Sequence, residues 1–183
     1  MVSKLLFIEG TKDIDNGDLR AAFNKLLTKK IAGKMPRIIM GEGKGQTIDK
    51  FLNTGLPNRR YLLIDLDAPE KEKEKDMVAH NLKTHESLTH YMIYEMEAWF
   101  FSQPEILDKY YSHDFSSKIK GRISSQIPHP DHELEKIAKN STHKTRKGYH
   151  KVRDGANLLE MLDANKLMVD FPDFKKLIDN LKK

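Results

Sequence analysis

The 183-residue chain contains no cysteine. Disulfide bonds and thiolate metal sites are therefore excluded, and the composition fits a reducing cytoplasm. The sequence also has no run of about 18 apolar residues, so we expect no transmembrane helix. The first nine residues hold too short an apolar stretch for a secretory signal and end in Glu9. We therefore predict a cytoplasmic protein without a membrane segment.

Two motifs of well-known enzyme sites are missing as well. None of the eight histidines lies in an H-E-x-x-H pattern, so we do not expect a zinc site. His129 and His132, on either side of Pro130, are interpreted as loop residues. The glycine-rich stretch Gly41–Gln46 lacks the GxxxxGK(S/T) spacing of a phosphate loop and is interpreted as a tight strand-to-helix turn. Lys44, at the start of the expected helix, is still a candidate for contact with a phosphate.

The residues that are present make a polar chain with enough apolar material for a core. Hydrophobic residues make up 38% of the sequence, charged residues 32%, and the mean hydropathy is −0.65. A chain of this length suits a single domain. The net charge of +5 and the isoelectric point near 9.2 favour polyanionic partners such as DNA or RNA.

Apolar patterns along the first part of the chain alternate between strand and helix. Four short runs are typical of strands: residues 4–9, 37–40, 60–66 and 89–94. Helical periodicity occurs between them: at about 15–30, through 48–52, and from about 71 to 82. This alternation predicts an α/β fold with a mostly parallel sheet flanked by helices.

The last third of the chain has helical patterns instead of strands. Three segments are expected to be helical: 131–139, 154–162 and 172–181. We predict one domain over 1–183, with a core at about 1–112 and a C-terminal helical extension at about 113–183 that packs on the same core. The aromatic run Trp99–Phe101 is interpreted as core and not as a platform for base stacking.

The chain is organised around the stretch Tyr61–Asp67, which has the pattern of a buried strand with two carboxylates at its end. Residues i and i+2 of a strand point to the same side, so Asp65 and Asp67 are expected to project together. Repulsion between paired carboxylates is relieved by a hard cation, and such pairs commonly hold Mg²⁺. An aspartate pair after a strand also serves in turns and helix caps, and this alternative stays open.

Acidic residues follow two other predicted strands. Glu9 follows the first strand, and Glu95 and Glu97 follow the fourth. The carboxyl ends of strands form the ligand crevice of an open α/β sheet, so these groups are expected to converge with Asp65 and Asp67. Five carboxylates in a small volume repel one another unless a cation neutralises them. Two Mg²⁺ ions about 4 Å apart would use these ligands to activate water, or one acid would serve as a general base.

A basic segment precedes the last helices. It contains five candidates for contact with nucleic acid: Lys144, Arg146, Lys147, Tyr149 and Lys151. Lysine and arginine neutralise backbone phosphates, and a tyrosine stacks on a base. A solvated surface loop is the alternative. If Lys144 or Lys147 reaches the acidic crevice, its charge would stabilise a phosphoryl transition state.

These motifs resemble known families. Ile8-Glu9-Gly10-x-x-Asp13 followed by Leu63-Ile64-Asp65-Leu66-Asp67 is similar to the Toprim signature, which has a Glu after its first strand and an Asp-x-Asp after its third. Further segments resemble the Toprim-like bacterial family called domain of unknown function 4276, often found beside ATPases in phage-defence-like loci: Met96–Phe100, Lys144, Tyr149–Lys151 and Phe171–Phe174. The similarity extends from Glu9 to Leu181.

The resemblance implies a Rossmann-like Toprim fold, related to that of OLD-type nucleases, and metal-dependent chemistry at a phosphodiester. It implies that Glu9 is a metal-linked acid or general base. Asp65 and Asp67 would be ligands of Mg²⁺ or Mn²⁺, and Glu97 and Glu95 would complete the acidic site.

The sequence departs from the longer acidic motif of many Toprim domains at Pro69, so a second metal would need Glu95 or Glu97. The expected function is that of a magnesium-dependent nuclease or phosphodiester-transfer enzyme acting on DNA or RNA. An ATPase partner protein in a bacterial defence system is expected to supply any use of ATP. The alternative is a non-catalytic adaptor that binds a partner protein or nucleic acid, and a small-molecule phosphohydrolase is a third possibility.

Overall fold

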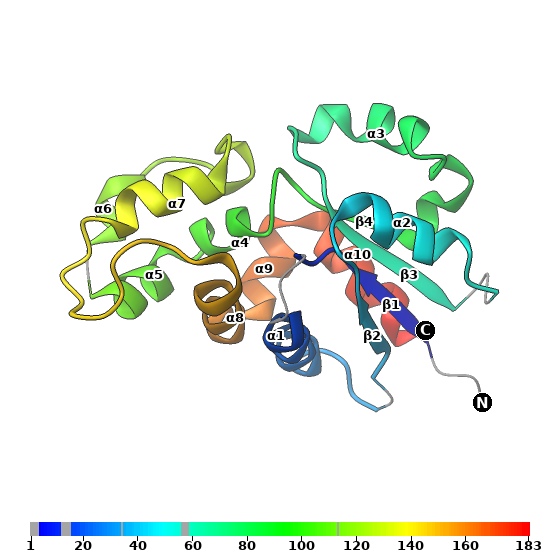
Figure 1. Cartoon of the computed structure of the whole chain (residues 1–183), viewed down its shortest axis with the longest axis horizontal. Coiled ribbons are helices and arrows are strands. Elements are labelled where there is room, and N and C mark those ends of the chain that lie inside the picture. The colour runs from blue at the N-terminus through cyan, green and yellow to red at the C-terminus, as the bar shows by residue number, and fades with distance from the viewer. Residues whose placement is uncertain (1–3, 12–15, 34, 56–58, 113) are drawn as a thin grey trace.

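The computed structural model of the chain describes residues 4–11, 16–33, 35–55, 59–112 and 114–183 (Figure 1). One four-stranded sheet forms its centre, and helices lie on both sides of it. Asp13, which belongs to the Toprim-like motif, lies outside the described residues.

The sheet is parallel throughout, which confirms the predicted α/β class. It contains four strands: β1 (Leu5–Ile8), β2 (Arg37–Met40), β3 (Arg60–Asp65) and β4 (Thr89–Met92). Their order is β2-β1-β3-β4, and the register places Asp65 opposite Met92. The carboxyl ends of β1, β3 and β4 are therefore neighbours along one edge of the sheet.

Side chains of the two central strands alternate between two apolar layers, as strand geometry requires. Leu6, Ile8 and Leu63 pack into the larger layer, whereas Phe7 and Leu62 pack into the smaller one. All five are buried, and each contributes about 1.5–3 kcal/mol by leaving water. Because both faces of the sheet are covered, β1 is apolar along its whole length and β3 is apolar between Arg60 and Asp65 at its two ends.

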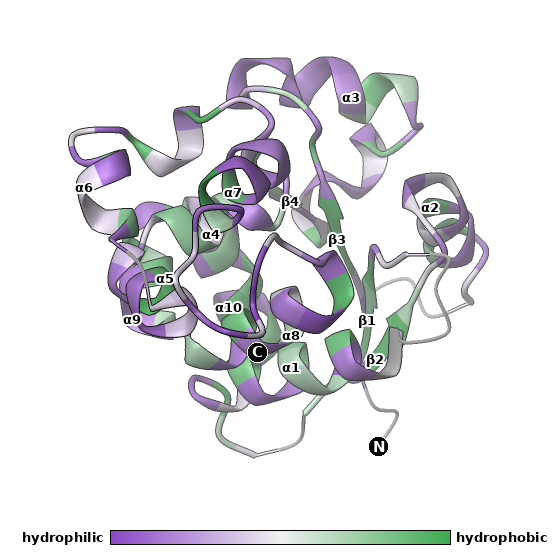
Figure 2. Ribbon diagram, turned by 60° about the vertical axis from the view of Figure 1, so that its left-hand side comes forward, coloured by the Kyte–Doolittle hydropathy of each residue, from purple (hydrophilic) through white to green (hydrophobic). Residues whose placement is uncertain are grey.

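Helices cover the two layers (Figure 2). The smaller layer is covered by two helices: α2 (Lys44–Leu52) and α3 (Lys73–Ala79). The larger layer is covered by three: α1 (Asn16–Thr28), α8 (Lys151–Met161) and α10 (Pro172–Lys182). Hydrophobic residues concentrate on the strands, while most of α3 is hydrophilic (Figure 2).

Further helices form a lobe beside the sheet (Figure 1). They are α4 (Glu97–Phe101), α5 (Pro104–Tyr111), α6 (Phe115–Ile119) and α7 (Pro130–Ala138), and α9 (Ala164–Asp170) then links α8 to α10. Short 3₁₀ turns lie at Glu70–Glu72, Lys83–Leu88 and Ser124–Gln126. The run Trp99–Phe101 is buried, which confirms its place in the core. No helix in the described ranges is both long and apolar enough to cross a bilayer.

Several details differ from the sequence-based prediction. β4 ends at Met92, two residues early, because the chain turns at Tyr94, where φ is 57°. Glu97 therefore begins a helix instead of following a strand directly. The short helices α6 and α9 were not predicted, and His132 lies within α7 instead of a loop.

Candidate acidic active site

The carboxyl edge of the sheet joins acidic side chains from three segments of the chain. Glu9 follows β1, and its Oε2 accepts a 3.1 Å hydrogen bond from the backbone N–H of Asp65 at the end of β3. Asp65 Oδ1 accepts a 2.9 Å bond from the backbone N–H of Met96. Met96 directly precedes Glu97, which begins α4. The structure thus brings the ends of β1 and β3 and the start of α4 together.

Asp65 lies in an enclosed part of this edge, where its side chain is 6% exposed. Burial raises the pKa of Asp65 well above its usual value. The ammonium of Lys151 acts in the opposite direction. Three neighbouring carboxylates raise the pKa further: Glu9, Glu97 and Asp67. Four acidic groups are therefore within electrostatic reach of one another.

Lys151 supplies the compensating charge. Its Nζ lies 3.5 Å from Asp65 Oδ2 and 3.6 Å from Glu97 Oε2. Burial disfavours the charged ammonium, but the surrounding acids outweigh it and raise the pKa of Lys151 above its usual value. The first residue of α8 is thus held as a cation between two buried carboxylates.

Tyr149 fixes the other oxygen of Glu97. The Tyr149 hydroxyl donates a 2.7 Å hydrogen bond to Glu97 Oε1, and Glu97 is 0% exposed. Gly155 of α8 leaves the space for this contact, because a Cβ there would lie 3.1 Å from the Tyr149 hydroxyl and 3.1 Å from Cε of Met96. The start of α4, α8 and the segment just before α8 therefore meet around the Glu97 carboxylate.

Glu95 lies beside this cluster and titrates near neutrality. Burial raises the pKa of Glu95 to about 7, and the charges of Glu97 and Asp131 act in the same direction. Glu95 Oε2 and Glu97 Oε2 are both buried and have no hydrogen-bond partner among the described residues. Because Glu97 Oε2 already faces the Lys151 ammonium at 3.6 Å, Glu95 Oε2 is the buried oxygen left to take up a proton.

Asp67 lies on the outer side of the same edge. The strand alternation that we expected to carry through Asp67 ends at Asp65, and the backbone enters the left-handed region at Asp67, with φ 59°. The Asp67 side chain is 58% exposed and lies 3.3 Å from Nζ of Lys44. Lys44 also forms a 2.8 Å ion pair with Asp76. The charge of Asp67 thus raises the pKa of Asp65, although Asp67 is exposed and Asp65 is buried.

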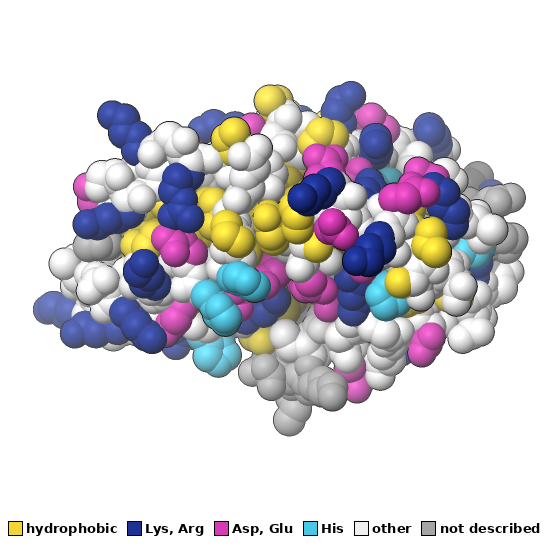
Figure 3. Space-filling view, turned by 90° about the horizontal axis from the view of Figure 1, so that it is seen from above, with side chains coloured by type: hydrophobic (Ala, Val, Ile, Leu, Met, Phe, Trp, Pro, Cys, Tyr) yellow, Lys and Arg dark blue, Asp and Glu magenta, His cyan; other side chains and the backbone are white. Residues whose placement is uncertain are grey.

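The predicted nucleic-acid-binding residues divide into two groups. Lys144 and Lys147 are exposed, and Arg146 is held by Tyr110, whose ring centre lies 4.1 Å below the guanidinium. The other candidates lie at the acidic edge instead: Lys44, Tyr149 and Lys151. Seen from above, lysine and arginine side chains are interleaved with acidic ones, and several histidines gather near the middle (Figure 3).

A small cavity of about 50 Å³ opens between Glu9, Asp65 and Lys151. Phe23 and Met96 form part of its apolar wall. Burial raises the pKa of Glu9, and the hydrogen bond from the Asp65 N–H counteracts this effect. The cavity has the size of a few atoms, so it would admit an ion or a single oxygen of a larger ligand.

The carboxylate oxygens at this edge are ligand atoms of the type that a hard cation prefers. Among the described residues, no group of three or more acids or histidines has the spacing of a complete metal site. Mg²⁺ usually takes one or two carboxylates and completes its shell with water and substrate phosphate oxygens. Glu9 and Asp65 are the carboxylates best placed for that role, since both line the cavity.

The sequence did not indicate which lysine of the basic segment contacts the acidic residues at the edge of the sheet. Contact with the crevice was considered only for Lys144 or Lys147, whereas the structure shows that Lys151 makes it. The available signal was the start of α8, where His150 Nδ1 accepts a bond from the Arg153 N–H and caps the helix. A capped helix start fixes the direction of its first side chain more firmly than a loop does.

Comparison with known proteins places the chain in a family. No curated protein and no solved structure matches it. A family model described as a domain of unknown function, DUF4276, matches residues 19–182. Asp65, Glu97 and Lys151 lie within the matched segment, and Glu9 precedes it. Because the match covers most of the chain, the protein belongs to the DUF4276 family.

Proposed function

We propose that the protein is a magnesium-dependent enzyme that cleaves or transfers phosphodiesters in nucleic acid, with a Toprim-like site. The observation that supports this most is the meeting of Glu9, Asp65 and Glu97 around the ammonium of Lys151. Buried acids combined with a cation at the carboxyl edge of a parallel sheet are typical of a catalytic crevice.

Glu9 and Asp65 would hold the metal, with Glu97 and the exposed Asp67 beside them. The bound Mg²⁺ or Mn²⁺ would lower the pKa of a water molecule and stabilise charge on a phosphate oxygen. The chain holds these carboxylates before any ligand arrives, because backbone N–H groups orient Glu9 and Asp65. Such fixed orientation is the main requirement of electrostatic catalysis.

Lys151 is placed to contact the substrate phosphate. Its ammonium borders the small cavity and is held there by Asp65 and Glu97. A cation at that point stabilises the negative charge that develops on phosphate oxygens in the transition state. Lys151 thus takes the role that the sequence left open for Lys144 or Lys147.

Glu95 is the candidate general base. A carboxyl group with a pKa of about 7 is able both to accept and to release a proton at neutral pH. Its buried Oε2, which has no hydrogen-bond partner in the described residues, is available to a water molecule.

Nucleic acid is the proposed substrate because the chain has a net charge of +5 and exposes Lys144 and Lys147 in the segment that leads to Tyr149. These lysines would follow the phosphate backbone outside the acidic edge. The proposal keeps an ATPase partner in a defence system as the expected source of ATP use.

The test is cleavage of DNA and RNA in the presence of Mg²⁺ or Mn²⁺. Asp65→Ala and Glu9→Ala should each reduce the rate by about a hundredfold or more, because loss of even a partner that only orients a metal ligand costs about 10–100-fold. Asp49→Ala, which removes an exposed acid from α2, is the matched control and should retain the rate. Robust cleavage by both site variants would show that the site is assigned wrongly.

A non-catalytic adaptor is the second candidate. It is favoured by one observation: Lys151 already neutralises Asp65 and Glu97, so the fold does not need a metal to balance these acids. Calorimetric titration with Mn²⁺ separates the two functions. Binding that is lost in Asp65→Ala supports the enzyme, whereas no binding to the intact protein supports the adaptor.

A further inference from the structure

Lys151 lies between two carboxylates without closing on either of them. Its Nζ is 3.5 Å from Asp65 Oδ2 and 3.6 Å from Glu97 Oε2, and it donates no hydrogen bond to any described residue. A lysine that is hydrogen-bonded to a carboxylate lies about 2.7–2.9 Å from its oxygen. The ammonium is therefore held by the charges of both acids and by a hydrogen bond to neither.

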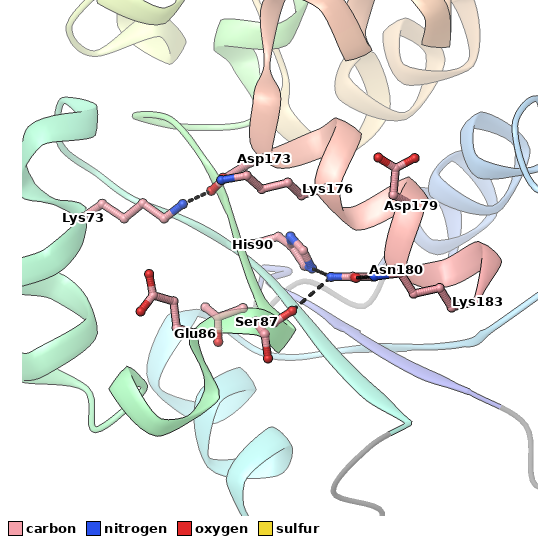
Figure 4. A pocket seen from close by; sticks show the side chains of 10 residues that line it. Lys73, Glu86, Ser87, His90, Asp173, Lys176, Asp179, Asn180 and Lys183 are labelled. Carbon is pink, nitrogen blue, oxygen red and sulfur yellow. Dashed lines mark hydrogen bonds and ion pairs between the residues drawn. The ribbon is translucent and has the colours of Figure 1, made fainter.

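Other lysines near the sheet pair with their acids more tightly. Lys44 lies 2.8 Å from Asp76. At a larger cavity beside the start of β4, the ammonium of Lys73 contacts Asp173 directly (Figure 4). Those lysines are hydrogen-bonded in ion pairs that join elements of the fold, whereas the longer contacts of Lys151 leave its ammonium able to move toward either acid.

Each of the two acids has one oxygen already bound to another group. Asp65 Oδ1 accepts a 2.9 Å bond from the backbone N–H of Met96, and Glu97 Oε1 accepts a 2.7 Å bond from the Tyr149 hydroxyl. Asp65 Oδ2 and Glu97 Oε2 are the oxygens that remain, and both face Lys151. A metal ion that binds Asp65 would therefore need the oxygen beside which the ammonium lies.

The two acids differ in their access to the small cavity of about 50 Å³. Asp65 lines this cavity together with Glu9 and Lys151, whereas Glu97 is not part of its described lining. Glu97 is instead 0% exposed, behind the ammonium. Asp65 is therefore placed to hold an ion in the cavity, and Glu97 is placed to hold Lys151.

The charges of the site favour a change of partner over expulsion of the lysine. When Glu9, Asp65 and Glu97 are all ionised, they carry three negative charges against the single ammonium of Lys151. A divalent cation at Glu9 and Asp65 would neutralise this group with Lys151 still in it. Glu97 would keep the ammonium, because a buried carboxylate without a counter-charge is costly.

We propose that Lys151 is an internal cation that neutralises Asp65 Oδ2 until a divalent metal ion binds there, and that Lys151 then pairs with Glu97 alone. Glu97 and Tyr149 are thus positioning residues, which act on the metal site through Lys151 and not as ligands. This exchange requires the metal site at Glu9 and Asp65, so it rests on the proposed function. Lys151 should therefore weaken metal binding even though the proposed reaction needs its charge.

The first test compares Mn²⁺ affinities by calorimetry. Lys151→Met removes the competing cation and should bind Mn²⁺ roughly tenfold more tightly than the intact protein, although it should lose cleavage. Lys120→Met is the matched control, because Lys120 is an exposed lysine that does not line the small cavity, and it should change the affinity less than about twofold. An affinity of Lys151→Met no higher than that of the control would overturn the proposal.

A measurement on the intact protein keeps the proposal testable if Lys151→Met does not fold. In NMR of lysine-labelled protein, the ε-methylene signal of Lys151, assigned with Lys151→Arg, should shift on saturation with Mg²⁺. The signal of Lys120 should stay in place. A Lys151 signal that does not move at saturation would overturn the proposal.

The second test asks whether Glu97 acts through Lys151, by means of a double-mutant cycle. Glu97→Gln alone should weaken Mn²⁺ binding roughly tenfold, because the ammonium then has only Asp65 as a partner. In the presence of Lys151→Met, the same replacement should change the affinity less than about twofold. An equal loss in both proteins would mean that Glu97 binds the metal itself, and the proposal would be rejected.

The outcomes separate this proposal from the proposed function. If neither the intact protein nor Lys151→Met binds Mn²⁺, both are rejected. If both bind it with equal affinity, only the exchange of Lys151 is rejected. If Lys151→Met binds it more tightly and the intact protein cleaves no nucleic acid, the exchange is supported and the nuclease function is rejected.

Discussion

The inner and outer sides of the acidic edge hold the same kind of residue in different surroundings. On the inner side, the side chains of Asp65 and Glu97 are 6% and 0% exposed and share the cation of Lys151. On the outer side, the Asp67 side chain is 58% exposed and contacts Lys44. Burial raises the pKa of Asp65, because a charge that loses water is costly unless it is paired.

The difference shows how the two sides are built. The outer pair joins residues from the first half of the chain, whereas the inner cluster needs a lysine from α8. Interactions on the inner side should therefore be strong and coupled, and those on the outer side weak and close to additive.

Replacing Lys151 should have the largest effect. Lys151→Met leaves Asp65 and Glu97 without the cation that contacts both, and should lower the free energy of unfolding by about 2–3 kcal/mol. This is below the usual cost of breaking a buried pair because the Lys151 side chain is 39% exposed. Urea unfolding at pH 7 measures the change, and Lys147→Met is the exposed control. A loss no larger than in the control would mean that water screens the inner side.

Removing the Tyr149 hydroxyl should have the next largest effect. Tyr149→Phe deletes its hydrogen bond to the buried Glu97 carboxylate and should cost about 1.5–3 kcal/mol. Gly155→Ala should act in the same direction, since the added Cβ would crowd the hydroxyl. Thermal or urea unfolding checks both, with Tyr94→Phe, a half-buried tyrosine near the same edge, as the control. If the losses of Tyr149→Phe and Gly155→Ala add up in the double variant, the two changes do not act through the same hydrogen bond to Glu97.

Stability should depend on pH through Glu95. The pKa of Glu95 is raised to about 7 in the folded protein, above the unfolded value of about 4.3. Between these values the folded state binds more protons, so this group lowers stability as pH rises from about 4.3 to 7. Glu95→Gln should flatten that decline and raise stability at pH 8 by about 1 kcal/mol, well below the full linkage effect, because Glu95 is only half-buried and water screens its charge. Urea midpoints at pH 5 to 8 measure it, and equal slopes for the two proteins would contradict the raised pKa.

Asp67 should show the smallest effect. Asp67→Asn keeps a residue type that tolerates the left-handed backbone at φ 59° and should change stability by less than about 0.5 kcal/mol. Asp67→Ala should cost about 1 kcal/mol because alanine is strained there. Urea unfolding of the two variants checks this, and an equal loss in both would mean that the charge, and not the backbone, matters on the outer side.

Much of the sheet was predictable because its strands are short, apolar and separated by helical patterns. The second strand has the predicted bounds, 37–40, and the predicted α/β class with a mostly parallel sheet is confirmed. Glu9 and Asp65 lie near each other because parallel strand ends share one edge, which is a property of topology and not of local sequence.

The rest of the site depends on packing that local patterns do not contain. Lys151 reaches Asp65 because α8 packs against α1, where Lys25 pairs with Glu160 at 2.7 Å and Lys29 donates to the Leu162 carbonyl at 2.7 Å. The end of β3 at Asp65 was also not predictable, since Asp-x-Asp fits a longer strand equally well. Roles in catalysis and nucleic-acid binding stay predictions.

The order of the site residues along the chain has a consequence for synthesis. A ribosome completes Glu9, Asp65 and Glu97 well before Lys151 leaves it. During that interval the nascent chain carries the acids without their internal counter-charge, so water, salt or a divalent ion must balance them. The acidic edge therefore closes around Lys151 only late in synthesis. A chain that stopped before α8 would keep the negative charge of the acids and lack the ammonium that balances it.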